Sequence, residues 1–149
     1  MIKLDKISDA TLSKEYYKRF YKGKGEFIKD GNEALRHFGN FVNPNKEQFM
    51  VAYLNGRNEI IDTEVLFKGS LTESAVHPRE LARRCLELGS AAVLLAHNHP
   101  SGNLSPSKED LKITAKIVKV LKLLDILVHD HIIIGNNDYT SFYLKGLLD

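Results

Sequence analysis

Two histidines, a serine and an aspartate lie close together in the segment HNHPSGNLSPSKED, residues 97–110. His97 and His99 follow the apolar run AAVLLA at 91–96, so they extend an expected strand, in which residues i and i+2 point to the same face. Their Cα atoms are then about 6.6 Å apart, and two imidazoles can reach one ion at about 2.0–2.1 Å from that separation. The spacing therefore predicts a pair of metal-ligating histidines.

An acidic partner for this pair comes from the helix expected after the strand. Pro100 ends the strand, while Ser105 is expected to cap the helix and Pro106 to occupy its first position. Asp110 then falls on the first turns, with Ser107 one turn earlier on the same side. Helix N-termini approach the carboxyl ends of strands in α/β domains. Two histidines and one aspartate that leave a fourth position open for water are typical of a catalytic zinc site.

The same residues also have a purely structural explanation. Ser107-x-x-Asp110 fits a capping box with nothing to bind, and neighbouring strand histidines can be satisfied by hydrogen bonds alone. A lone His-x-His would favour this explanation, whereas the added Ser and Asp favour a metal site. Cys85 is the only cysteine and falls on an apolar helix face, so we expect it in the core and any metal site to use His, Asp and Glu.

Hydrophobic periodicity predicts the elements that position these residues. Helices are expected at 30–39, 77–89 and 106–124, and strands at 48–54, 59–67, 91–96, 126–134 and 139–144. The second helix would bury Leu81, Ala82, Cys85, Leu86 and Leu88, and the third Leu111, Thr114, Ile117, Val118, Leu121 and Leu124. The order predicts a layered α/β domain with a mixed β-sheet flanked by helices.

Length and charge narrow the classes of function. The 149 residues fit one domain, and no apolar run approaches the roughly 20 residues of a membrane span. The N-terminus lacks an apolar stretch like that of a signal peptide, so we expect a cytoplasmic protein without membrane contact. Residues 1–29 carry eight Lys/Arg against four Asp/Glu, and residues 30–149 carry 13 against 15. We expect a basic leader at 1–29, a compact domain at 30–149, and DNA binding that is weak or absent.

The order His97-x-His99, seven residues, Ser107, two residues, Asp110 reproduces the JAMM motif, so the chain resembles the JAB/MPN+ metalloprotease superfamily. HNHPSG…PSKED, with HPRE upstream and DHIIIG downstream, is similar to its RadC branch. The resemblance implies a cytidine-deaminase-like α/β fold and zinc-dependent hydrolysis of peptide or isopeptide bonds. It implies that His97, His99 and Asp110 bind zinc, and that Ser107 hydrogen-bonds the catalytic water or the developing oxyanion.

The motif also requires an upstream glutamate that takes a proton from the activated water and passes it to the leaving nitrogen. Glu80 lies at the start of a helix, where the helix dipole favours a carboxylate for structural reasons. Glu64 lies in the middle of a strand and reads as a solvent-facing residue. Glu47 stands just before the strand at 48–54, where the superfamily places its glutamate. We therefore choose Glu47 as the general base, with Glu64 second.

The sequence thus predicts a JAMM-type zinc hydrolase whose peptide or protein-conjugate substrate is not specified. The alternative is a DNA-associated accessory protein of the RadC family with a structural or vestigial metal site. RadC proteins usually have a helix-hairpin-helix module before this domain, for which residues 1–29 have no room. His129 and His131 form a second His-x-His, for which we favour a buried, hydrogen-bonded His131 over a second metal site.

Overall fold

The computed structural model describes Ser8 and residues 28–69 and 76–148, and most of the basic leader lies outside these residues. The described residues form three helices and five strands, in the predicted order. The helices are α2 (Gly31–Gly39), α3 (Pro78–Leu88) and α4 (Lys108–Leu123). The strands are β1 (Gln48–Leu54), β2 (Ile60–Lys68), β3 (Ala92–Asn98), β4 (Leu127–Gly135) and β5 (Asp138–Ser141).

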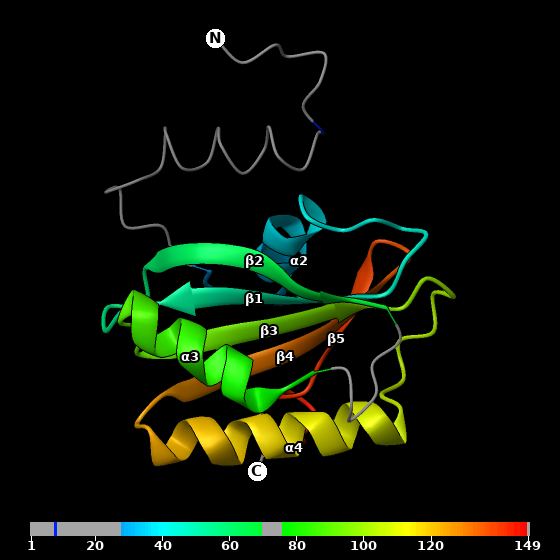
Figure 1. Cartoon of the computed structure of the whole chain (residues 1–149). Helices are drawn as coiled ribbons and strands as arrows, with labels where there is room; N and C mark the ends of the chain where they lie inside the picture. The colour runs from blue at the N-terminus through cyan, green and yellow to red at the C-terminus, as the bar shows by residue number, and fades with distance from the viewer. Residues whose placement is uncertain (1–7, 9–27, 70–75, 149) are drawn as a thin grey trace, which may run out of the picture.

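The strands form one mixed sheet in the order β2-β1-β3-β4-β5 (Figure 1). The two hairpins, β1–β2 and β4–β5, are antiparallel, and β1 also runs antiparallel to β3. Only β3 and β4 are parallel, because α4 carries the chain back across the sheet between them. The layered α/β fold with a mixed sheet that the sequence predicts is therefore confirmed.

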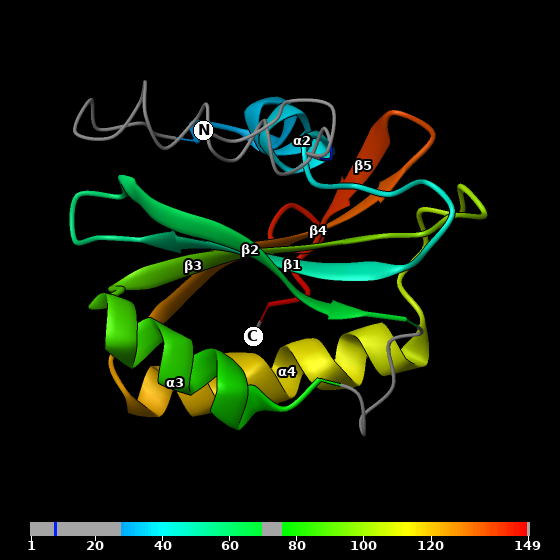
Figure 2. The same ribbon diagram turned by 45° about the horizontal axis from the view of Figure 1, so that its top comes forward.

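The helices cover the two faces of the sheet unequally. Figure 2 shows α2 on one face and both α3 and α4 on the other. Two apolar clusters fill the spaces between these layers, one built around Phe38 under α2 and the other around Leu81 and Ile117 under α3 and α4. All seven residues of β3 are buried, since the strand lies in the middle of the sheet between both layers. Polar side chains at its end are consequently held in a rigid setting.

Helix α4 begins two residues later than the sequence suggests. Ser107, and not Ser105, is the N-cap, because its side chain accepts from the Asp110 amide while the Asp110 side chain accepts from the Ser107 amide. The buried stripe is Asp110, Ile113, Thr114, Ile117 and Leu121. The predictions that Leu111, Val118 and Leu124 are buried were wrong: Leu111 and Leu124 are about 40% exposed and Val118 is half-buried. The buried face of α4 is therefore the one that carries Asp110, and it is rotated from the face that the sequence predicts.

Helix α3 begins at Pro78 and ends at Leu88, and its C-cap is Gly89, whose φ of 66° a glycine adopts without steric cost. Leu81, Ala82 and Cys85 are buried as predicted. The prediction that Leu86 is buried was wrong, since it is 62% exposed, and Leu88 is half-buried. Burial raises the pKa of Cys85 to about 11, which makes it a core residue and not a nucleophile. None of the helices in the described part of the chain is long and apolar enough to cross a membrane.

Candidate metal centre

The carboxyl end of β3, the amino end of α4 and the start of β1 meet at one edge of the sheet. His97 pairs with Phe49 in the β1–β3 ladder, so Glu47, two residues before Phe49, lies beside the end of β3. His99 lies just past β3, and its amide donates to the carbonyl of Ile134 at 2.8 Å, which keeps the chain extended there. Asp110 is the third residue of α4 and is buried. The fold therefore brings four chemically active side chains together.

Three ligand-type groups in this cluster face one another directly. The Nε2 atoms of His97 and His99 are 2.9 Å apart. Oδ1 of Asp110 lies 3.2 Å from Nε2 of His97, and Oδ2 lies 3.2 Å from Nε2 of His99. A tetrahedral zinc site with bonds of about 2.0–2.1 Å separates its ligand atoms by about 3.3–3.4 Å. The observed spacing fits a single ion held by these three side chains.

Glu47 completes the cluster. One carboxylate oxygen of Glu47 and one ligand atom from each of His97, His99 and Asp110 all lie within 4.8 Å of one another. Its charge is also one cause of the raised pKa of His99, after the larger effect of the hydrogen bond to Asp110. The glutamate is half-buried, so its carboxylate adjoins both the cluster and solvent.

The cluster carries a buried negative charge. Asp110 is 1% exposed, and burial alone would raise its pKa, but its hydrogen bonds to His97 and His99 outweigh that effect and hold the pKa well below its usual range. A carboxylate that stays ionised in such a setting needs compensating positive charge. A divalent cation between the three groups would supply that compensation without protonating the histidines.

Each of the three candidate ligands, His97, His99 and Asp110, is oriented by a further hydrogen bond. Nδ1 of His99 contacts the carbonyl oxygen of Asn103, and Nδ1 of His97 lies 2.7 Å from Nε2 of His131. Oδ2 of Asp110 accepts from the Ser107 amide at 2.8 Å. The capping box considered from the sequence therefore exists, and Asp110 serves it while still facing the histidines. The Ser107 hydroxyl oxygen accepts from the Asp110 amide at 3.0 Å, which leaves the hydroxyl hydrogen to donate elsewhere.

Asn98, which the sequence interpretation overlooked, ties the Glu47 loop to β3. Its Nδ2 donates to the carbonyls of Asn43 and Lys46 at 3.2 and 2.8 Å, and its Oδ1 accepts from the Gln48 amide at 2.8 Å. Asn98 is only 3% exposed, so these bonds are shielded from water. The sequence did contain a signal for this role, because Asn98 is a polar residue between two candidate ligands at the end of a buried strand.

Comparison with known proteins places this geometry in a family. The profile of the RadC-like JAB domain family matches residues 28–147. The chain belongs to the RadC-like JAB domain family. The match covers every helix and strand described above, so the fold and the cluster are both parts of the family domain.

Several curated proteins are similar to this RadC-like JAB domain. It is 50% identical over 103 residues to UPF0758 protein YfjY and 49% identical over 109 residues to UPF0758 protein YeeS, both from Escherichia coli K12. It is 47% identical over 102 residues to UPF0758 protein STH371 from Symbiobacterium thermophilum. These matches cover 69%, 73% and 68% of this chain, and 64%, 74% and 44% of the respective relatives. The chain thus spans less than two thirds of YfjY and under half of STH371.

The other two candidate glutamates of this RadC-like JAB domain have structural partners elsewhere. Glu64 accepts hydrogen bonds from the Tyr53 hydroxyl and from Nε of Arg84, the latter at 3.0 Å. The expectation that Glu64 simply faces solvent was therefore wrong, because it is part of an ion-paired cluster on the α3 side of the sheet. Glu80 pairs with Arg83 on the exposed surface of α3 at 3.1 Å. Neither glutamate is part of the cluster around His97.

The two histidines of the second His-x-His have hydrogen-bond partners on different elements. His131 is fully buried and lies between His97 and Thr114, whereas Nε2 of His129 contacts Oδ1 of Asn58 at 2.8 Å. Burial lowers the pKa of His131 well below its usual value. Among the described residues, one group of three or more His, Cys, Asp or Glu side chains is close enough to share an ion. It is the cluster of Glu47, His97, His99 and Asp110. The favoured interpretation of a buried, hydrogen-bonded His131 agrees with these contacts.

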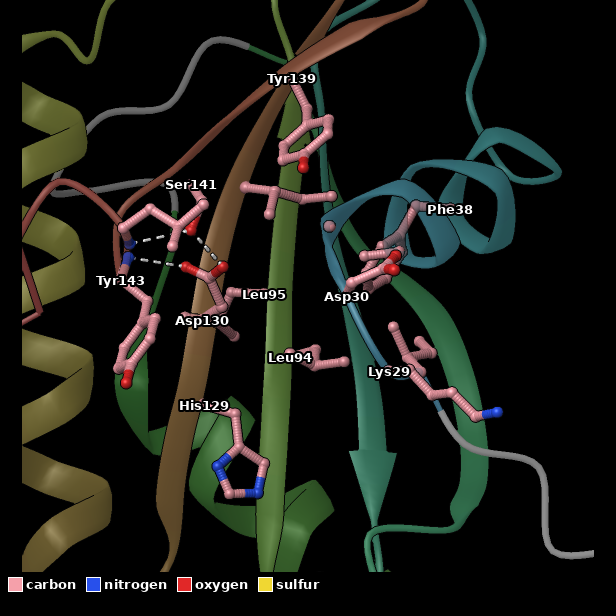
Figure 3. Close-up of a pocket in the computed structure, with 15 residues that line it drawn as sticks. Lys29, Asp30, Phe38, Leu94, Leu95, His129, Asp130, Tyr139, Ser141 and Tyr143 are labelled. Atoms are coloured by element: carbon pink, nitrogen blue, oxygen red, sulfur yellow. Dashed lines mark hydrogen bonds between the residues drawn. The ribbon is translucent and has the colours of Figure 1, made fainter.

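A cavity of about 360 Å³ lies on a different part of the domain, between α2 and the strands β4 and β5 (Figure 3). Asp130 lines it, and its carboxylate accepts from the Ser141 hydroxyl and from the Tyr143 amide. His129 and Tyr139 also line it, whereas none of the four clustered residues does. The cavity is therefore separate from the candidate metal centre.

Proposed function

We propose that this RadC-like JAB domain is a zinc-dependent hydrolase of peptide or isopeptide bonds. The observation that carries the proposal is the clustering of Glu47 with His97, His99 and Asp110, whose ligand atoms lie within 4.8 Å of one another. Family membership supports the same class of chemistry, because the residues of the JAMM pattern are the ones that converge.

The donor set favours zinc among the common metal ions. Two imidazole nitrogens and one carboxylate oxygen are typical of catalytic zinc sites, whereas calcium and magnesium prefer ligand sets made of oxygen alone. His97, His99 and Asp110 would hold the ion, and their separations of 2.9–3.2 Å suit a tetrahedral arrangement. Zinc supplies, when bound, the Lewis acidity that makes water more acidic and polarises a carbonyl group.

The protein's own groups account for the proton transfers. Glu47 accepts a proton from the attacking water as the water oxygen bonds to the carbonyl carbon, and then delivers that proton to the nitrogen as the C–N bond breaks. Ser107 donates its remaining hydroxyl hydrogen to the oxygen that gains negative charge, a role left open by its other contact with the Asp110 amide. The products are a carboxylic acid and a free amine.

Glu47→Gln tests this assignment. Gln keeps the size of Glu but cannot accept a proton at neutral pH, so the variant should bind zinc as the wild type does and lose turnover by about 10²–10⁴-fold. A panel of internally quenched peptides and a lysine isopeptide reporter would measure turnover, and elemental analysis would measure zinc. Glu109→Gln, an exposed residue of the first turn of α4, is the matched control and should keep both.

Two results would overturn the assignment. Unchanged turnover in Glu47→Gln would remove Glu47 as the base. Loss of zinc from Glu47→Gln would make Glu47 a fourth ligand, which closes the site and favours the structural metal of the alternative hypothesis.

A further inference from the structure

A continuous chain of buried hydrogen bonds connects two of the candidate ligands behind the metal centre. Nδ1 of His97 lies 2.7 Å from Nε2 of His131, and Nδ1 of His131 lies 2.6 Å from Oγ1 of Thr114. The Thr114 hydroxyl in turn donates to the backbone carbonyl of Asp110 at 2.7 Å. His97, His131 and Thr114 are all 0% exposed, so water does not compete for these bonds.

The chemistry of the groups fixes the direction of every proton in this chain. The Asp110 carbonyl can only accept, so it takes the single hydrogen of the Thr114 hydroxyl. The Thr114 oxygen must then accept from Nδ1–H of His131. A neutral imidazole carries one N–H, so Nε2 of His131 offers a lone pair and accepts from Nδ1–H of His97. In a neutral His97, Nε2 is then the nitrogen without a proton.

A single hydrogen bond favours the same tautomer in His99. Its Nδ1 contacts the carbonyl oxygen of Asn103, which can only accept, so the ring proton lies on Nδ1. In the neutral rings both Nε2 atoms carry lone pairs, which lie 2.9 Å from each other and 3.2 Å from the Asp110 carboxylate. A proton taken up at either Nε2 would instead be donated to that carboxylate. Three lone-pair donors converge on one point, and a cation is the partner that this arrangement suits.

The middle of the chain is held firmly in place. The ring of His131 stacks on Phe142, with centroids 4.6 Å apart and planes at 24°, and it meets Phe49 edge-on at 5.7 Å. His131 lies on β4 opposite Leu95 of β3, two residues before His97. Packing against Phe49 and Phe142 therefore restricts the orientation of the His131 ring independently of its hydrogen bonds.

We propose that His131 and Thr114 are positioning residues that preset His97 as the tautomer with an unprotonated Nε2, ready to bind a metal ion. Outer-shell hydrogen bonds of this kind fix ring orientation and ligand basicity, and their loss typically costs about 10–100-fold in metal affinity. The inference rests on the metal site of the proposed function, but the tautomer itself is a property of the metal-free protein.

The structure provides a matched pair of variants for the test. Thr114→Val removes the hydroxyl while keeping the side-chain shape. Thr63→Val does the same to another buried hydroxyl, which lies 2.7 Å from Nε2 of the buried His37 on the α2 side of the sheet. Both changes remove a buried threonine–histidine contact, and only Thr114 belongs to the chain behind the metal centre.

Two measurements decide the proposal. Zinc affinity, from competition with a chromogenic chelator at pH 7, should fall about 10–100-fold in Thr114→Val, recover in Thr114→Ser and stay unchanged in Thr63→Val. Long-range ¹H–¹⁵N correlation of histidine-labelled, metal-free wild type should show His97 protonated on Nδ1. Equal losses of affinity in Thr114→Val and Thr63→Val would overturn the proposal, as would a His97 that carries its proton on Nε2 and none on Nδ1. If the wild type binds no zinc, the proposed function fails while the tautomer measurement still decides this inference.

Discussion

The side chain of Asn98 accepts a hydrogen bond from the backbone amide of Gln48 at 2.8 Å, although fifty positions separate the two residues in the chain. Asn98 is the last residue of β3 and lies between His97 and His99, and Gln48 follows Glu47 directly. The contact therefore fixes the candidate base relative to the candidate ligands. The start of β1 and the end of β3 are thus joined by one polar clamp.

Removing this clamp should reduce turnover more than it reduces metal binding. Asn98→Ala removes the partner of the Gln48 amide and of the Lys46 carbonyl, and one of the two donors to the Asn43 carbonyl. The expected cost is about 1–3 kcal/mol in the free energy of unfolding. Zinc should remain, because the ligands lie on β3 and α4, while turnover falls as Glu47 loses its position. Urea unfolding and reporter hydrolysis measure the two effects.

Asn55→Ala is the control for this variant. Asn55, like Asn98, hydrogen-bonds the backbone through its side chain, since it accepts from the amides of Arg57 and Glu59. It lies at the hairpin end of β1, away from the candidate metal centre. It should destabilise the protein and leave turnover per folded molecule unchanged. Equal losses of turnover in the two variants would show that Asn98 acts through global stability alone.

Glu64→Gln should affect stability and not catalysis. Glu64 pairs with Arg84, whose side chain is only 23% exposed, and also accepts from the Tyr53 hydroxyl. Neutralising it weakens a partly shielded ion pair, so we expect a loss of about 1 kcal/mol in the free energy of unfolding. Zinc content and hydrolysis should match the wild type. A drop in turnover comparable with that of Glu47→Gln would reverse the ranking of the two glutamates.

The stability of the metal-free protein should fall as the pH is lowered from 7 to 5. Burial lowers the pKa of His37 to about 4, whereas an unfolded histidine titrates near its ordinary value of about 6.5. Between these values the unfolded chain binds more protons, so acid favours unfolding. At about 1.4 kcal/mol per pH unit, His37 contributes roughly 2 kcal/mol of this loss by pH 5.

His37→Gln isolates this contribution, since Gln can still hydrogen-bond Thr63 but does not titrate. Urea unfolding at pH 7 and pH 5 should show a smaller loss in the variant than in the wild type. Identical losses would mean that His37 does not carry the pH dependence.

DNA binding should be weak and insensitive to sequence. Residues 30–149 carry 13 Lys/Arg against 15 Asp/Glu, so the family domain offers no net positive charge to phosphates. Fluorescence anisotropy with labelled duplexes at about 0.15 M salt is the appropriate measurement. Submicromolar, sequence-dependent affinity that survives His97→Ala would instead favour the DNA-associated accessory protein.

The sequence predicts the order of elements because their signals are local. Gly89 ends α3, the apolar run at 91–96 marks β3, and the lysines of α4 alternate with its buried stripe. The start of α4 was misplaced because both Ser105 and Ser107 can cap a helix. Only the reciprocal bonds between Ser107 and Asp110 decide between them.

The residues that support the candidate metal centre were harder to predict. The pattern of ligand types at fixed spacing indicates His97, His99 and Asp110, because these lie within one strand–loop–helix unit. Asn98 and Thr114 have partners that are distant in sequence or in another element, and the role of His131 depends on the pairing of β4 with β3. Such contacts follow from strand register, which periodicity alone does not specify.

The metal content of the purified protein tests the central claim most directly. After reconstitution with zinc and removal of the excess, elemental analysis should find about one zinc per chain in the wild type. Asp110→Ala and His97→Ala should each lose the metal, and their melting temperatures should no longer rise when zinc is added. Absence of zinc from the reconstituted wild type, or zinc that persists in both variants, would contradict the assignment of this cluster as a zinc site.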